Sequence, residues 1–175
     1  MAAKKKVAKR GKKKPGISPG LLVSDRVQIR DVRLVSCGYE QKPAAAAGKK
    51  SYDIKTSTDV QLDEEQGIIV VLANFHFEAS IERKKSQEPV LTIHALYALA
   101  YHVESFDGLS QEGFEQFADL NGVYNAWPYW REFVQNAVGR MGLPPLTIPV
   151  FRIFESPSGA ATAKKTKRKR KKRAD

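Results

Sequence analysis

Apolar and polar side chains alternate along three long segments of the chain, at residues 52–62, 68–82 and 89–103. In the first of these, Ile54 and Leu62 share one side of an extended strand with Thr and Val residues, and the opposite side carries Asp, Lys and Gln. A period of two is typical of a strand that buries one face. The three segments are therefore predicted to be β-strands.

A fourth segment, 26–36, is also strand-like, but its alternation changes parity near Asp31, which indicates a bulge or a change of face. Polar turns at 63–67 and 83–88 separate the later strands. Consecutive strands joined by turns, without intervening helices, favour an antiparallel sheet over a parallel α/β arrangement.

Helical signals follow the strands. Ser110 is a suitable N-cap for a first helix, and Asn121-Gly122 is expected to end it. Asn125 is expected to cap a second helix with Pro128 in its first turn, and Gly142 is expected to end that helix. Apolar residues recur at helical spacing in the second helix: Trp130, Phe133, Val134, Ala137, Val138 and Met141. The predicted fold class is α+β, with a four-stranded antiparallel sheet and two helices packed on one side.

An apolar segment, Leu146–Phe154, follows the prolines after the second helix. It is expected to be extended and to lie against the sheet or in a groove. The domain is expected to span residues 21–155, between two disordered basic tails, 1–20 and 156–175.

The charge of the chain is concentrated in these tails. Residues 1–14 hold eight Lys and Arg and no acid, and residues 160–175 hold nine Lys and Arg and one acid. The two tails therefore carry +16, and because the whole chain carries +11, its middle part is mildly acidic. Such runs are most often solubilising tails, and a second interpretation is electrostatic attachment to RNA, ribosomes or anionic lipid.

Composition places limits on the class of protein. Hydrophobic residues make up 42% of the chain, which is sufficient for a core, and the single cysteine, Cys37, excludes an internal disulfide. We find neither an apolar leader nor a run of about 20 apolar residues that would span a membrane. The sequence therefore predicts a soluble, cytoplasmic protein.

The sequence contains no recognisable catalytic motif, whether a phosphate-binding glycine loop, a nucleophile elbow or a zinc-protease motif. His76 and His94 can approach each other on adjacent strands, but a metal site needs a third ligand that the sequence does not supply. Cys37 lacks an activating neighbour. We therefore expect no enzyme activity, no metal and no cofactor.

Large aromatic residues are numerous for a small domain. They gather on the two long strands and around the expected helix junction: Phe75, Phe77, Tyr97, Tyr101, Tyr124, Trp127, Tyr129 and Trp130. Each is suited to core packing between sheet and helix. Eight rings also provide enough surface for some to line a groove or subunit interface.

The segment Trp127-Pro-Tyr-Trp-Arg-Glu132 resembles the Phe-Pro-Tyr-x-Arg-Glu signature of the SecB family of protein-export chaperones. Val138–Gly142 and Leu143–Leu146 are similar to the helix end and proline-rich return of that family, and the order of four strands before the helices agrees. The resemblance covers roughly residues 24–152.

This resemblance implies an ATP-independent chaperone that holds unfolded or newly made polypeptides, including export preproteins, in apolar grooves. It also implies a homotetramer built as a dimer of dimers. SecB-like chaperones that protect antitoxins are a second possibility within the family. Under this hypothesis, the eight aromatic residues are the candidates for peptide binding, led by Trp127, Tyr129 and Trp130, while Arg131 and Glu132 are structural.

The chain departs from the family pattern on its first strand. The family has Asp-x-Ser-Phe-Glu, an acidic face that docks the export motor SecA, whereas this chain keeps Asp31 but has Arg33 and Val35 at the Ser and Glu positions. The sequence thus weakens the case for SecA as a partner. The alternative function is a nucleic-acid- or ribosome-binding protein that acts through its basic tails, with steeply salt-dependent binding.

Overall fold

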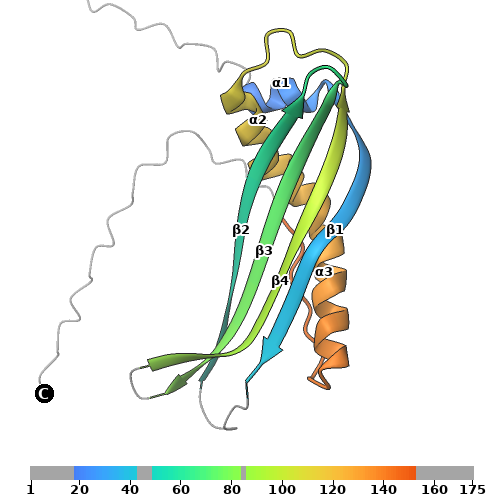
Figure 1. Ribbon diagram of the computed structural model, residues 1–175. Helices are drawn as coiled ribbons and strands as arrows, with labels where there is room; N and C mark the ends of the chain where they lie inside the picture. Colours follow the sequence, from blue (N-terminus) through green and yellow to red (C-terminus); the bar gives the residue numbers. More distant parts are fainter. Residues whose placement is uncertain (1–17, 43–48, 84–85, 153–175) are drawn as a thin grey trace, which may run out of the picture.

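The computed structural model describes residues 18–42, 49–83 and 86–152, which form one curved sheet with helices along one face (Figure 1). The four strands are β1 (Val27–Gln41), β2 (Lys49–Asp63), β3 (Ile68–Arg83) and β4 (Ser86–Val103). All neighbouring strands are antiparallel, and their order across the sheet is β1-β4-β3-β2. The predicted fold class is confirmed. The expected C-terminal tail, 156–175, and residues 1–17 of the expected N-terminal tail lie outside the described residues.

Strand register follows the alternation seen in the sequence. Phe75 of β3 lies opposite Thr56 of β2 and Ala95 of β4, so the apolar positions of the three strands share one face. Strand β1 changes register between Ile29 and Asp31, which confirms the predicted bulge, and again between Leu34 and Ser36. Each bulge adds a residue to β1 and bends this edge strand, as the curved ribbon in Figure 1 shows.

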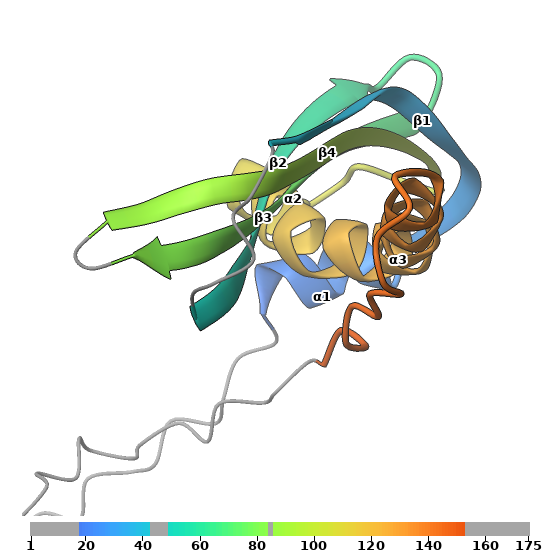
Figure 2. The ribbon, with the colours of Figure 1, turned by 90° about the horizontal axis from the view of Figure 1, so that it is seen from below.

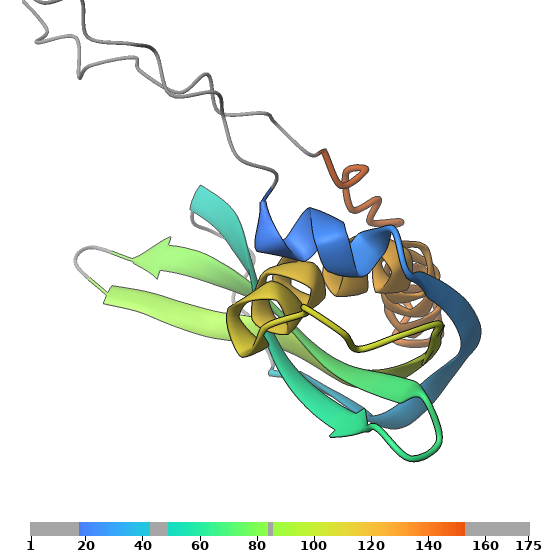
Figure 3. The same ribbon diagram turned by 90° about the horizontal axis from the view of Figure 1, so that it is seen from above.

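The helices lie on a single face of the sheet, as the views from below and above show (Figures 2 and 3). They are α1 (Pro19–Ser24), α2 (Gln111–Phe117), the π-helical turn η1 (Ala118–Gly122) and α3 (Val123–Arg140). The short helix α1 was not expected and begins before residue 21, the predicted domain boundary. Its sequence signal is Ser18-Pro19: the Ser18 hydroxyl accepts a hydrogen bond from Leu21 N, and proline is favoured at the first helical position.

The predicted break between two helices at Asn121-Gly122 is wrong. Gly122 has helical angles (φ −60°, ψ −51°), and the wider turn η1 carries the chain from α2 into α3 without an interruption. Asn125 does not cap a helix, because its side chain donates a hydrogen bond to the Tyr101 hydroxyl (3.0 Å). Pro128 accordingly lies inside α3 and not in a first turn, so the helix lacks one backbone hydrogen bond there.

The outer ends of the helical layer match the sequence signals. The Ser110 hydroxyl accepts a hydrogen bond from Gly113 N at the start of α2. At the end of α3, Gly142 has φ +67°, Leu143 N donates to Val138 O, and Gly142 N donates to Gly139 O. This pair of hydrogen bonds is a Schellman cap, which fixes the direction in which the chain leaves the helix.

The core lies between the helices and the concave face of the sheet. Its largest fully buried side chains are Trp130, Tyr101, Phe75, Phe77 and Phe117. Among the described residues, no helix is long and apolar enough to cross a membrane.

Candidate functional site

An open cleft of about 480 Å³ lies where α3 passes the edge of the sheet. Its walls come from β1, from the first half of α3 and from the segment after α3. The lining residues are Ile29, Val32, Tyr124, Asn125, Trp127, Pro128, Tyr129, Arg131, Val150 and Phe151. Most are apolar or aromatic, and none is a carboxylate. This set will be called the junction cleft.

The segment that follows α3, residues 143–152, forms one wall of the junction cleft. It has no regular secondary structure, and residues 153–154 of the predicted extended segment lie outside the described residues. Trp127 Nε1 donates to Pro149 O (2.8 Å), and Arg131 Nε donates to Ile148 O (2.8 Å). Arg131 is therefore structural, as expected, but it fixes the returning segment through its backbone. These two bonds hold Val150 and Phe151 against the helix.

Three of the eight candidate aromatic residues line the junction cleft. Tyr124 and Tyr129 are 50% and 48% exposed, and Trp127 is half-buried. The Phe151 ring lies 5.2 Å from the Trp127 ring and 6.4 Å from the Tyr124 ring, centroid to centroid. Aromatic rings from α3 and from the return segment thus form a continuous surface that side chains of another polypeptide can reach.

The other five candidate residues belong to the core. Trp130, Phe75, Phe77, Tyr97 and Tyr101 are each less than 5% exposed, so they offer no surface for direct contact with a client. Trp130 stacks on Phe75 at 5.3 Å, and Phe75 also contacts Trp127 edge to face at 5.9 Å. Four of these rings support the cleft from behind, through contacts of Phe75 with Trp127 and Trp130, of Tyr97 with Tyr129 and of Tyr101 with Asn125, whereas Phe77 stacks on Tyr52.

Two buried polar groups lie behind the cleft. Burial raises the pKa of the Tyr101 hydroxyl, although the hydrogen bond from Asn125 acts in the opposite direction. Trp130 Nε1 is buried and has no hydrogen-bond partner within the described part of the chain. Because neither side chain is accessible, both contribute packing to the cleft and not reactive groups.

The β1 wall of the cleft was not among the predicted site residues. Ile29, 47% exposed, and the half-buried Val32 come from the stretch beside the first bulge. A possible signal was the mixed parity of this strand, because a regular strand would direct its apolar residues to one face only. Val150 and Phe151 were expected only as parts of an apolar segment that lies against the sheet or in a groove, and the structure places them in the wall of the cleft.

The face of the sheet opposite the helices carries the remaining candidates. His76 and His94 are direct cross-strand neighbours, and His76 Nε2 lies 3.9 Å from Glu78 Oε2. Within the described ranges, no group of three or more His, Cys, Asp or Glu side chains could hold a metal ion. Asp31, the acidic residue shared with the SecB pattern, is paired with Arg33 at 2.5 Å.

The fold and site together define a class of protein. A four-stranded antiparallel sheet, a long helix across one face and an aromatic cleft beside an edge strand form a SecB-like scaffold.

Comparisons with known proteins agree. Two curated relatives from Mycobacterium tuberculosis strains, the SecB-like chaperones Rv1957 and MT2006, are each 28% identical over 148 residues, which cover 75% of this chain and 81% of the relative. The chain also resembles a solved structure, the Mycobacterium tuberculosis Rv1957 SecB-like chaperone in complex with a ChAD peptide from the Rv1956 HigA1 antitoxin. The superposition has a TM-score of 0.69 and 26% sequence identity, and it covers 78% of this chain and 99% of the Rv1957 chain. No family model matches the chain. The chain is therefore similar in sequence and in fold to SecB-like chaperones.

Proposed function

We propose that this protein is an ATP-independent molecular chaperone that holds unfolded or newly made polypeptides in the junction cleft. Its similarity to SecB-like chaperones supports the class of activity. The observation that carries the proposal is that Tyr124 and Tyr129 are each about half exposed in a mainly apolar cleft with no carboxylate. Flat aromatic surfaces bind varied apolar segments with little loss of conformational entropy.

The strength of such binding follows from the area available. Burying apolar surface contributes roughly 25 cal/mol per Å², so a client that covers about 200 Å² gains around 5 kcal/mol before the cost of ordering it. One cleft is therefore a weak site. Several clefts on one oligomer would raise the apparent affinity through effective concentration.

We propose that the assembly is a homotetramer, a dimer of dimers. Within the described residues, β1 is an edge strand paired only with β4, and it exposes Leu34, Val35 and Tyr39. An edge with unpaired backbone groups and exposed apolar side chains is suited to pairing with a second copy. Strand β2, the other edge, carries alternating Asp and Lys side chains that protect it from such pairing.

Among client classes, antitoxin-like polypeptides are better supported than export preproteins. The solved SecB-like neighbour binds a peptide from an antitoxin. In this chain Arg33 pairs with Asp31, and the exposed Val35 replaces the acidic residue of the SecB docking pattern. The first change adds a positive charge and the second removes a negative one, so both make less acidic the surface that family members use to dock SecA.

Suppression of aggregation tests the proposal. The full chain should keep a chemically denatured test protein in solution without ATP, and Tyr124→Ser with Tyr129→Ser should reduce this activity at least severalfold. Leu120→Ser is the matched control, because Leu120 is 41% exposed in η1 of the same helical run but does not line the cleft.

Circular dichroism and size-exclusion chromatography would verify folding and assembly. Equal activity in all three proteins would refute a client site in the cleft. If raising the salt concentration alone abolishes the holding activity, the result would favour the alternative in which the basic tails bind through their charge.

A further inference from the structure

Arg131 is the one charged residue among the described residues that line the junction cleft. It follows Trp127 by four positions on α3, so the two side chains lie on the same face of the helix. Arg131 is half-buried, and together with Pro128 it also lines a smaller pocket of about 190 Å³ beside residues 146–148. A positive charge therefore lies at the border between the aromatic cleft and this second pocket.

The guanidinium of Arg131 is only partly used within the protein. Its Nε donates a hydrogen bond to Ile148 O (2.8 Å). In residues 18–42, 49–83 and 86–152, the terminal nitrogens Nη1 and Nη2 find no hydrogen-bond acceptor, and Arg131 takes part in no ion pair. The adjacent carboxylate on the helix, Glu132, accepts a hydrogen bond from the Asn136 side chain and does not line the cleft. Both terminal nitrogens are thus left to bind another molecule.

The other polar residues that line the cleft are neutral. Tyr124, Tyr129 and Asn125 carry hydroxyl and amide groups, and the Asn125 nitrogen already donates to the Tyr101 hydroxyl. A client that covers the cleft removes water from Arg131, and the loss of hydration of a charged group is unfavourable unless a hydrogen-bond acceptor replaces the water. A carboxylate is the best replacement, because its two oxygens match the paired N–H groups of a guanidinium.

We propose that Arg131 makes the junction cleft selective for client segments in which a carboxylate lies directly beside apolar residues. This inference rests on the proposed function and names its client class. The apolar side chains would pack on the rings of Tyr124 and Trp127, and the carboxylate would accept hydrogen bonds from Nη1 and Nη2 of Arg131. An Asp or Glu side chain and the C-terminal carboxylate of a client offer the same chemistry, so the test separates these two sources. A Lys or Arg of the client at this place would be repelled.

Four synthetic peptides test the inference with the full chain. Three share one apolar segment of about eight residues, a fluorophore at the N-terminus and an amide at the C-terminus. They differ only in the residue directly after the segment, which is Glu, Gln or Lys. The fourth is the Gln peptide with a free C-terminal carboxylate. Fluorescence anisotropy would measure the dissociation constant of each peptide.

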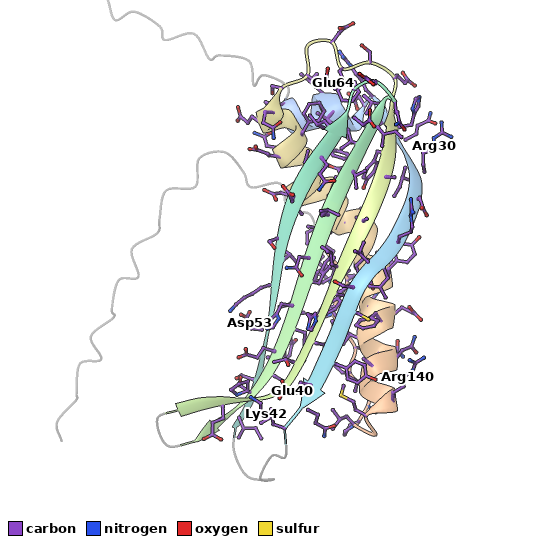
Figure 4. The ribbon with its side chains drawn as sticks, in the orientation of Figure 1. Arg30, Glu40, Lys42, Asp53, Glu64 and Arg140 are labelled. Carbon is purple, nitrogen blue, oxygen red and sulfur yellow. The ribbon has the colours of Figure 1, made fainter. Side chains whose placement is uncertain are left out.

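Each peptide would be measured against the unchanged protein and four variants. Arg131→Gln removes the charge, and Arg131→Lys keeps it without the paired N–H groups. Arg140→Gln is the charge-matched control, because Arg140 is the last residue of α3, is exposed and does not line the cleft. Figure 4 shows Arg140 near the lower end of that helix. Trp127→Phe controls for a loosened return segment, because it removes the hydrogen bond to Pro149 O and leaves every charge in place.

The unchanged protein should bind the Glu peptide about three- to tenfold more tightly than the amidated Gln peptide, and the Lys peptide more weakly than either. Arg131→Gln should abolish this preference and Arg131→Lys should keep only part of it, whereas Arg140→Gln and Trp127→Phe should preserve the ratio. Raising the salt from about 50 to 500 mM should reduce the preference while the Gln peptide still binds, because ions screen charges but not the apolar contact. Tighter binding caused by Glu alone would assign the carboxylate to client side chains, and tighter binding caused by the free terminus alone would assign it to client C-termini.

Three results would overturn the inference. Neither carboxylate could tighten binding to the unchanged protein, the preference could persist in Arg131→Gln, or it could fall equally in Arg140→Gln, which would make it an effect of net charge. If Arg131→Gln does not fold, Arg131→Lys decides, because an undiminished preference in that variant would equally overturn the role of the guanidinium. If no peptide binds any protein, the proposed function itself fails, whereas equal binding of all four peptides refutes only the selectivity.

Discussion

Gly122 of the helical layer lies directly against Val71 of the sheet, and this contact gives a direct test of the packing. A β-carbon built on Gly122 would lie 2.6 Å from Cγ1 of Val71, which is fully buried on β3. Gly139, in the same helical run, has no atom within 4 Å of the corresponding position. The same substitution, glycine to alanine, should therefore be less favourable at Gly122 than at Gly139.

The magnitudes follow from two terms. Replacing glycine by alanine inside a helix stabilises it by up to about 1 kcal/mol, and this term applies to both positions. Overpacking a well-packed core costs about 1–3 kcal/mol, and this term applies only to Gly122. Gly139→Ala should stabilise the protein slightly, and Gly122→Ala should be less stable than Gly139→Ala by about 1–3 kcal/mol.

Urea denaturation at one protein concentration would measure both free energies of unfolding, since an oligomer makes stability depend on concentration. Val71→Ala supplies the second arm of a double-mutant cycle. It should be destabilising alone, yet it should remove most of the penalty of Gly122→Ala when the two are combined. Equal stability of the two glycine variants, or strict additivity with Val71→Ala, would refute the contact.

Four further outcomes follow from the same structure. Trp130→Ala should cost about 3–5 kcal/mol in a thermal or urea melt, because its ring is fully buried. Trp127→Phe keeps a ring but loses the hydrogen bond to Pro149, so amide exchange in residues 146–152 should accelerate with a loss of about 0.5–1.5 kcal/mol. Arg33→Ser should change stability by less than about 0.5 kcal/mol, because its ion pair with Asp31 is largely exposed. Burial raises the pKa of Tyr101 above 10.0, so the unfolded chain loses this proton at a lower pH than the folded protein. The free energy of unfolding should therefore fall as the pH rises above 10.0, and it should fall less steeply in Tyr101→Phe when both proteins are unfolded across a pH series.

The sheet was predictable because its signal is local and repeated. Alternation over more than ten residues in β2, β3 and β4 determines which face is buried, and any slip of one residue would expose the whole apolar set. The helix junction was not predictable in the same way. Asparagine followed by glycine is a typical helix terminator, but Gly122 is required here for its lack of a side chain against Val71, which only the tertiary contact reveals.

The candidate site shows the same limit within one helix. Trp127 and Trp130 are three residues apart on α3 and have similar sequence surroundings, yet one lines the cleft and the other is fully buried. Helical periodicity places residues three apart on neighbouring parts of one face, so it cannot separate the border of a core from its centre. The separation depends on tertiary contacts: Trp130 stacks on Phe75 of the sheet, whereas Trp127 donates a hydrogen bond to Pro149 in the return segment.

This division between buried and accessible rings has a consequence for binding. Trp130 stacks on Phe75 and anchors α3 to the sheet, while Trp127 contacts Phe75 from one side and Phe151 from the other. The cleft wall is thus held by core contacts before any client arrives, so no binding free energy is spent on ordering the wall.

Core substitutions behind the wall should therefore weaken client binding even when the protein remains folded. The sharpest example is Phe75→Leu, which retains an apolar side chain but removes the ring that both Trp127 and Trp130 contact. Phe77→Leu is the control, because the Phe77 ring stacks on Tyr52 and does not line the cleft. Phe75→Leu should reduce holding activity more than Phe77→Leu. Equal activity of these two variants at equal stability would show that the wall does not need this support.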